Sequence, residues 1–192
     1  MDTRLVSEAN RDNFVFIHIN KTGGTSIETA LGLNLRHKTA QEMIQELGLR
    51  NWQKRFTFAF VRNPWDRVVS HYHYRVETNQ TGLATERISF TEWVFRAYGT
   101  RDPAYCDTRR FFMPQNNWII DEKGNVVVEF IGRFENLEND FAVVCKRLDR
   151  TVTLQHIKKS HHDHYRSYYN EATKKIVAKR FQVDIERFGY CF

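Results

Sequence analysis

The stretch FVFIHINKTGGTSIETAL, which runs from Phe14 to Leu31, decides the fold. Phe14–Ile19 is an apolar run that only His18 interrupts, as expected of a strand buried on both faces of a parallel sheet. A polar turn with two glycines follows, and Thr25–Glu28 (TSIE) fits a capping box that predicts a helix from the second glycine or just after it. The stretch therefore predicts a strand, a turn and a helix in direct succession.

The turn NKTGGTS (Asn20–Ser26) has the residues of an anion-binding site. The first N–H groups of a helix lack helical acceptors, and the helix dipole adds partial positive charge there. Gly23 and Gly24 let the backbone approach an anion because they have no Cβ, and Lys21 adds an ammonium group. A Walker A loop places its lysine after the last glycine instead, and no predicted strand ends in an acidic residue that could bind magnesium. Taken alone, the turn is equally compatible with a flexible connection that binds nothing.

A second predicted strand ends in a second cationic loop. Phe56–Val61 (FTFAFV) reads as a buried strand, Arg62 follows it, and Pro64 is well placed at the start of a helix. Ser70 comes eight residues after Arg62, which is about two helical turns. The planar guanidinium of Arg62 suits phosphate, and Ser70 can donate a hydroxyl. If the two strands are neighbours, a ligand with two separated anionic groups can span both loops.

The rest of the chain predicts helices around this sheet. Capping boxes at Thr39–Glu42 and Ser89–Glu92 predict a helix after each. The turn DEKGN between two apolar runs indicates a hairpin or a short strand pair. The tail from Tyr165 to Phe188 has helical spacing. We therefore predict a single α/β domain over residues 1–192, with an open parallel sheet and flanking helices.

The composition favours a folded protein with an anionic partner. A hydrophobic content of 41% is typical of globular chains. The net charge of +6 favours a nucleotide, a sulfated or acidic sugar, or nucleic acid, although a solvated basic surface gives the same count. Three scattered cysteines suit a reducing compartment. The N-terminus does not resemble a signal peptide, and no apolar run approaches the roughly 20 residues of a membrane span. We expect a cytoplasmic protein with no membrane partner, in which residues 1–13 form a flexible segment.

The two loops together resemble those of sulfotransferases that use 3′-phosphoadenosine 5′-phosphosulfate (PAPS). FIHINKTGGTS resembles the 5′-phosphosulfate loop of this family, P-K-T-G-G-T-S, except that Asn20 replaces its usual proline. FVRNPWDRVVSHYHY resembles the 3′-phosphate motif, V-R-D/N-P-x-x-R-x-x-S. FIGRFENLENDF and the C-terminal tail resemble the carbohydrate O-sulfotransferase branch, and the motif order is similar to that of heparan sulfate 2-O-sulfotransferase. The resemblance covers Phe14–Phe192 and implies a P-loop-like sulfotransferase fold.

The resemblance implies which residues bind PAPS. The residues expected at the 5′-phosphosulfate are Lys21, Thr22, Gly23, Gly24, Thr25 and Ser26, and those at the 3′-phosphate are Arg62 and Ser70. Lys159 and Ser160 resemble a late loop that closes over the nucleotide. Lys21 is also expected to act in catalysis. PAPS would be the co-substrate, adenosine 3′,5′-bisphosphate the product, and no metal would be required.

A histidine is expected to act as general base, because the acceptor hydroxyl must lose its proton and histidine titrates near neutral pH. His37 is our choice: it precedes the second strand, much as the catalytic histidine does in heparan sulfate 2-O-sulfotransferase-like enzymes. An ordinary loop histidine is the alternative. We expect His18 to be a satisfied buried residue, and His71 and His73 are the next candidates for the base. The HHDH cluster at 161–164 is not expected to bind a metal.

The leading hypothesis is sulfuryl transfer from PAPS to an acceptor hydroxyl. The family likeness favours a saccharide, and small hydroxylated metabolites remain open as acceptors. One alternative is a P-loop nucleotide kinase, against which the order of the lysine and the absent magnesium carboxylate count. Another is a basic nucleic-acid-binding module without catalysis, which leaves both anion loops unexplained, so we expect no nucleic-acid partner. The sequence does not indicate the oligomeric state.

Overall fold

The computed structural model describes residues 13–34, 36–154 and 163–192. The chain divides into two compact units, one formed by Met1–Val61 with Asn117–Lys158 and the other by Arg62–Asn116 with Lys159–Phe192. The proposed flexible segment falls almost entirely outside the described residues. That residues 1–192 form a single domain stays a prediction.

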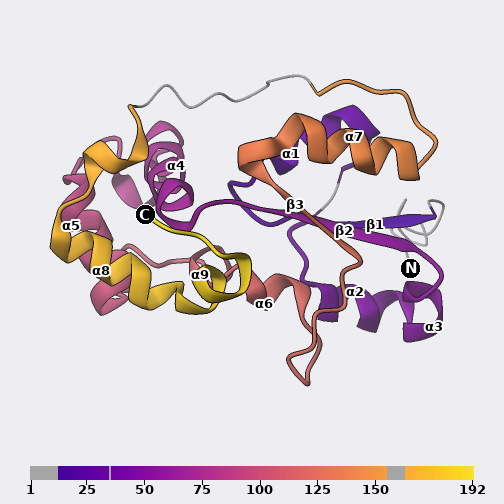
Figure 1. Ribbon diagram of the computed structural model, residues 1–192. Coiled ribbons are helices and arrows are strands. Elements are labelled where there is room, and N and C mark those ends of the chain that lie inside the picture. The colour runs from indigo at the N-terminus through magenta and orange to yellow at the C-terminus, as the bar shows by residue number, and fades with distance from the viewer. Residues whose placement is uncertain (1–12, 35, 155–162) are drawn as a thin grey trace, which may run out of the picture. The chain divides into compact units, whose positions relative to one another are not determined.

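A parallel sheet forms the centre of the first unit. In the described residues it has three strands in the order β1-β2-β3 (Figure 1). The strands are β1 (Phe14–Ile17), β2 (Phe56–Val61) and β3 (Phe130–Arg133). Phe58 of β2 pairs with Phe16 on one side and with Phe130 on the other. The predicted α/β class with a parallel sheet is confirmed, and β2 has its predicted bounds.

Helices lie on both faces of this sheet, as is typical of a parallel sheet (Figure 1). The helices of the first unit are α1 (Gly24–Leu31), α2 (Ala40–Leu47), α3 (Leu49–Trp52) and α7 (Leu137–Arg147). In Figure 1, α1 and α7 cover one face, and α2 and α3 lie on the other. Phe16 and Phe58 stack with ring centroids 5.0 Å apart, and Ile27 of α1 and Phe141 of α7 belong to the same buried cluster. This burial of apolar surface holds the two helices against the strands.

Of the two capping boxes that the sequence predicts in the first unit, the structure contains one. The box at Thr39–Glu42 is confirmed, because the Thr39 hydroxyl accepts from the Glu42 N–H at 3.2 Å and the Thr39 N–H donates to the Glu42 carboxylate at 2.7 Å. Helix α1 begins at Gly24 as predicted, but the box at Thr25–Glu28 is wrong. Gly23 is the N-cap, with a left-handed φ of 84°. Glu28 therefore lies in the second turn, where its carboxylate pairs with His18.

The predicted hairpin around DEKGN is small. Among the described residues, its pairing consists of one antiparallel bridge between Ile120 and Val126. Residues on either side form other elements: Asn116–Ile119 is the short helix α6, and Phe130–Arg133 joins β2 as β3. The apolar run before the turn thus starts as a helix. The run after it ends in the central sheet, where a full parallel ladder is available.

The second unit is helical and has an aromatic core. Its longer elements are α4 (Pro64–Glu77), α5 (Phe90–Val94), the π-helix Phe95–Thr100, α8 (Glu171–Arg180) and α9 (Gln182–Phe188), and its 3-10 turns are Gln80–Gly82, Arg109–Phe112 and Tyr165–Tyr168. Trp65, Tyr72, Trp93 and Phe181 lie in one buried cluster. Pro64 opens α4 as predicted. The helical tail is interrupted at Phe181, between α8 and α9.

None of the helices in the described part of the chain combines the length and the apolar character that crossing a membrane requires.

Candidate active site

The loop between β1 and α1 has a backbone suited to an anion. Lys21 and Gly23 both have left-handed backbones, with φ of 66° and 84°. This conformation is unusual for lysine, because its Cβ crowds the backbone there. Thr22 is fully buried, and its hydroxyl donates to the Ile19 carbonyl at 2.9 Å, which closes the turn. The turn leads directly into α1, whose first N–H groups have no helical acceptors.

Gly24 is required by a close contact inside this loop. A Cβ at this position would overlap the imidazole of His18. His18 is itself held in place, because it is buried and its Nδ1 lies 2.7 Å from a carboxylate oxygen of Glu28. The expectation that His18 is a satisfied buried residue is confirmed. Glycine at position 24 therefore lets the start of α1 pack directly against a fixed side chain.

We expect Gly24→Ala to destabilise the protein by about 1–3 kcal/mol, the usual cost of overpacking a filled site. Urea unfolding would measure the loss. Gly99→Ala is the matched control, because Gly99 also lacks a positive φ and an added Cβ there meets ordinary contacts of 3.6 Å or more. The cost should shrink when Gly24→Ala is made in a His18→Ala background. An equal cost in both backgrounds would contradict the overlap as its cause.

His37 lies beside His18 in a geometry that sets its tautomer. Its Nδ1 is 2.9 Å from the His18 carbonyl oxygen, and the two ring centroids are 4.2 Å apart. A carbonyl can only accept, so Nδ1 carries the proton in this contact. In the neutral ring the lone pair then belongs to Nε2, as a general base acting through Nε2 requires. The edge of Trp118 lies near the same imidazole, with ring centroids 6.2 Å apart.

Arg62 and Ser70 lie in the second unit, at the start and in the middle of the segment that follows β2. Both are buried. The Arg62 Nε donates to the Asp66 carboxylate at 2.9 Å, one helical turn further along. The second arginine of the motif, Arg67, donates to the carbonyl of Met113 at 3.3 Å, and burial lowers the pKa of its guanidinium. Arg67 therefore holds the backbone at Met113.

The predicted site residues are divided between the two units. Lys21–Ser26 and His37 belong to the first unit, whereas Arg62 and Ser70 belong to the second. The strands β1 and β2 run parallel and end at the same edge of the sheet. The loop to α1 follows β1, and Arg62 follows β2 in the chain. Lys159 and Ser160 lie outside the described residues, as do His161 and His162. In the described ranges, no group of three or more His, Cys, Asp or Glu could hold a metal.

Several contacts that hold candidate site residues in place could not be predicted from the sequence. His71, a reserve candidate for the base, is buried in the aromatic core and its Nδ1 lies 3.1 Å from the Tyr98 hydroxyl, so its surroundings are those of a packed residue. Gln115 contacts Arg62 across 53 positions and Asp184 across 69. No local pattern marks contacts at such separations.

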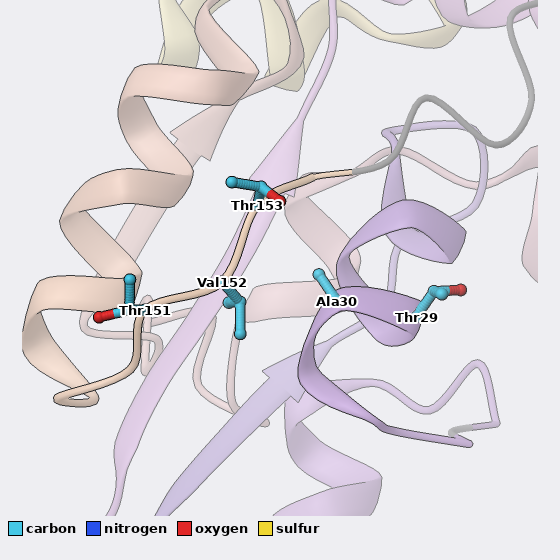
Figure 2. Close-up of a pocket in the computed structure, with 5 residues that line it drawn as sticks. All are labelled: Thr29, Ala30, Thr151, Val152 and Thr153. Atoms are coloured by element: carbon cyan, nitrogen blue, oxygen red, sulfur yellow. The ribbon is translucent and has the colours of Figure 1, made fainter.

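A pocket in the first unit lies away from the loop between β1 and α1. Figure 2 shows it between α1 and the segment after α7, and it is lined by Thr29, Ala30, Thr151, Val152 and Thr153. Thr29 and Ala30 belong to the last turn of α1, whereas the loop from β1 precedes the first turn. The described residues that line it carry no charge. The pocket is therefore a poor match for an anionic nucleotide.

The match to a family model is what shows the family of this chain. A family model described as "Sulfotransferase family" matches residues 6–191. A protein of Archaeoglobus fulgidus, described as uncharacterized, is 35% identical over 92 residues, which is 47% of this chain and 65% of the relative. The match thus spans slightly less than two thirds of that relative. A crystal structure of a sulfotransferase from Alicyclobacillus acidocaldarius is similar with a TM-score of 0.47 and 14% identity, covering 92% of this chain and 94% of that one.

Proposed function

Because the chain belongs to the sulfotransferase family, we propose that it transfers a sulfuryl group from PAPS to the hydroxyl of an acceptor. The observation that carries the proposal is the loop between β1 and α1. It combines a lysine, two left-handed backbone positions and the N-terminus of a helix within a few residues. Such a loop attracts a phosphate or sulfate group. The segment that contains Arg62 resembles the 3′-phosphate motif of PAPS-dependent sulfotransferases, and this likeness supports a second contact with the nucleotide.

We propose that the two loops divide the nucleotide between them. Residues 21–26, from Lys21 to Ser26, would bind the 5′-phosphosulfate through backbone N–H groups, hydroxyls and the lysine ammonium. Arg62 and Ser70 would bind the 3′-phosphate. Support for this division comes from the parallel pairing of β1 with β2, which places the ends of the two strands at one edge. Lys159 and Ser160 are proposed to close over the nucleotide.

The proposed reaction is an in-line displacement at sulfur. The acceptor oxygen forms a bond to sulfur while the bond from sulfur to the bridging phosphate oxygen breaks, and both bonding electrons leave with that oxygen. Lys21 would stabilise the negative charge that develops on the leaving phosphate. His37 would accept the hydroxyl proton at Nε2. The contact between its Nδ1 and the His18 carbonyl supports this role, since it favours the required tautomer.

The acceptor is proposed to be a saccharide, with small hydroxylated metabolites as the other class. A saccharide fits the likeness of residues 130–141 to carbohydrate O-sulfotransferases. A screen of acceptors with labelled PAPS, followed by mapping of the sulfated position, would identify it. We also propose a cytoplasmic location, which the free thiols of Cys106, Cys145 and Cys191 support.

A ligand series tests the donor. Thermal unfolding would be followed with adenosine 3′,5′-bisphosphate, with ATP and magnesium, and with an oligonucleotide. A ligand at 100 times its Kd stabilises the native state by about 2.7 kcal/mol. We expect the bisphosphate to stabilise the protein most strongly at equal concentration. A larger shift with ATP and magnesium would favour the kinase, and one with the oligonucleotide would favour a nucleic-acid-binding module.

We expect Arg62→Ala to weaken binding of adenosine 3′,5′-bisphosphate by about 1.5–3 kcal/mol, the worth of a charge-assisted hydrogen-bond pair. Calorimetry would compare this ligand with adenosine 5′-phosphosulfate, which lacks the 3′-phosphate and should bind the variant and the wild type alike. Arg147→Ala, which removes an exposed arginine, is the matched control. If the wild type binds both nucleotides equally, Arg62 does not bind the 3′-phosphate.

Activity is expected to persist in EDTA. Lys21, Arg62 and the N-terminal amides of α1 would supply the positive charge that magnesium supplies in kinases. The measurement is the rate of sulfuryl transfer before and after chelation. A loss of activity that added zinc or magnesium restores would contradict a metal-independent mechanism.

A further inference from the structure

The backbone of Arg62 is held by one buried side chain. The Gln115 carboxamide oxygen accepts from the Arg62 N–H at 2.9 Å, and its NH2 group donates to the Arg62 carbonyl at 2.8 Å. Gln115 thus pairs with both backbone groups of one residue, as a neighbouring strand does in an antiparallel ladder. Gln115 has no exposed surface. The contact therefore fixes the peptide groups on both sides of the Arg62 Cα.

Gln115 is fixed in turn by Asp184 of α9. One Asp184 oxygen accepts from the Gln115 N–H at 2.8 Å and is 3.4 Å from the Gln115 NH2 group. The other accepts from the Asn116 N–H at 2.8 Å. Asp184 is also fully buried. Burial raises the pKa of its carboxyl group, whereas the N–H groups of Asn116 and Gln115 lower it.

A third contact restrains the side chain of Arg62. Its Nε donates to Asp66 at 2.9 Å, so the plane of the guanidinium is fixed as well as the backbone. Burying a carboxamide and a carboxylate costs free energy that an apolar pair of similar size avoids. Gln115, which Asp184 holds, therefore provides directional hydrogen bonds to Arg62 that apolar packing does not provide.

We propose that Gln115, anchored by Asp184, is a positioning residue for the 3′-phosphate site. The inference rests on the proposed function, in which Arg62 binds the 3′-phosphate. A fork that binds phosphate through two parallel N–H groups depends on its orientation. Gln115 fixes the backbone of Arg62. It would thereby orient the Arg62 guanidinium toward the 3′-phosphate. Gln115 does not touch the nucleotide in this proposal.

Gln115→Met tests the proposal, since methionine matches the length of glutamine and removes the carboxamide. We expect binding of adenosine 3′,5′-bisphosphate to weaken about 10-fold, as when the partner that orients a metal ligand is lost. Binding of adenosine 5′-phosphosulfate should stay within about twofold. Gln53→Met, at an exposed position, controls for the added thioether. If Gln115→Met does not fold, as judged by circular dichroism, Asp184→Asn replaces it, with the same expected loss of 3′-phosphate preference.

A double-mutant cycle separates positioning from a general structural role. In an Arg62→Ala background, Gln115→Met should cause no further loss of bisphosphate binding. Equal weakening of both nucleotides, or unchanged bisphosphate binding, would overturn the inference. If Arg62→Ala abolishes the preference for the 3′-phosphate and the Gln115 variant keeps it, this inference alone fails. If Arg62→Ala keeps the preference, the proposed role of Arg62 fails, and this inference fails with it.

Discussion

Lys21→Ala is expected to lower kcat by about 10²-fold or more, comparable to removing a strong donor from an oxyanion site. The proposed role of the ammonium group is to meet charge that develops on the leaving phosphate. Such an interaction is strongest in the transition state, so its loss should reduce kcat and not simply raise KM. The measurement is steady-state turnover of PAPS with a saturating acceptor.

Two variants separate the charge of Lys21 from the strain of its backbone. Lys21 has a φ of 66°, which alanine also adopts at a cost and glycine adopts freely. Lys21→Gly should therefore be more stable than Lys21→Ala and equally inactive. Lys54→Ala, at an exposed position, is the control for loss of a lysine. Wild-type turnover in a folded Lys21→Ala protein would remove Lys21 from the mechanism.

His37→Ala is expected to lower kcat by about 10²–10⁴-fold, the usual contribution of a general base. Affinity for adenosine 3′,5′-bisphosphate should hardly change, because the base must act on the side of sulfur opposite the leaving phosphate. The wild-type rate should rise with pH as the imidazole loses its proton, since only the neutral ring accepts one. The variant should lose this ascending limb.

The pH profile decides whether His37 is the base. His164→Ala, which removes an exposed histidine, should keep both the rate and the limb. An alanine variant at His37 that also keeps both would exclude it, and His71 and His73 would be tested next. Both rings pack against aromatic side chains of the second unit. His71 lies against Trp93 and Phe112, and His73 lies against Tyr72 and Tyr168.

Local patterns in the sequence were sufficient for the main elements of the fold. The bounds of β2, the start of α1 at Gly24 and the capping box at Thr39–Glu42 agree with prediction. Each depends on residues within a few positions of one another, through side-chain periodicity or a hydrogen bond across one helical turn. The two proposed anion loops could be located for the same reason, since in each a strand, a short polar turn and a helix start form one continuous segment. Their ligands stay predictions.

The tertiary structure decided which partner each polar side chain takes. Glu28 matched a capping pattern, yet it pairs with His18, because the helix begins two residues earlier than the box requires and Glu28 therefore lies in the second turn. The tautomer of His37 depends on a carbonyl 19 positions away. Gln115 and Arg62 meet across 53 positions. Local propensities reach only a few residues, whereas these hydrogen bonds exist because folding removes the groups from water, and a buried polar group must then bond to whatever donor or acceptor the packing brings beside it.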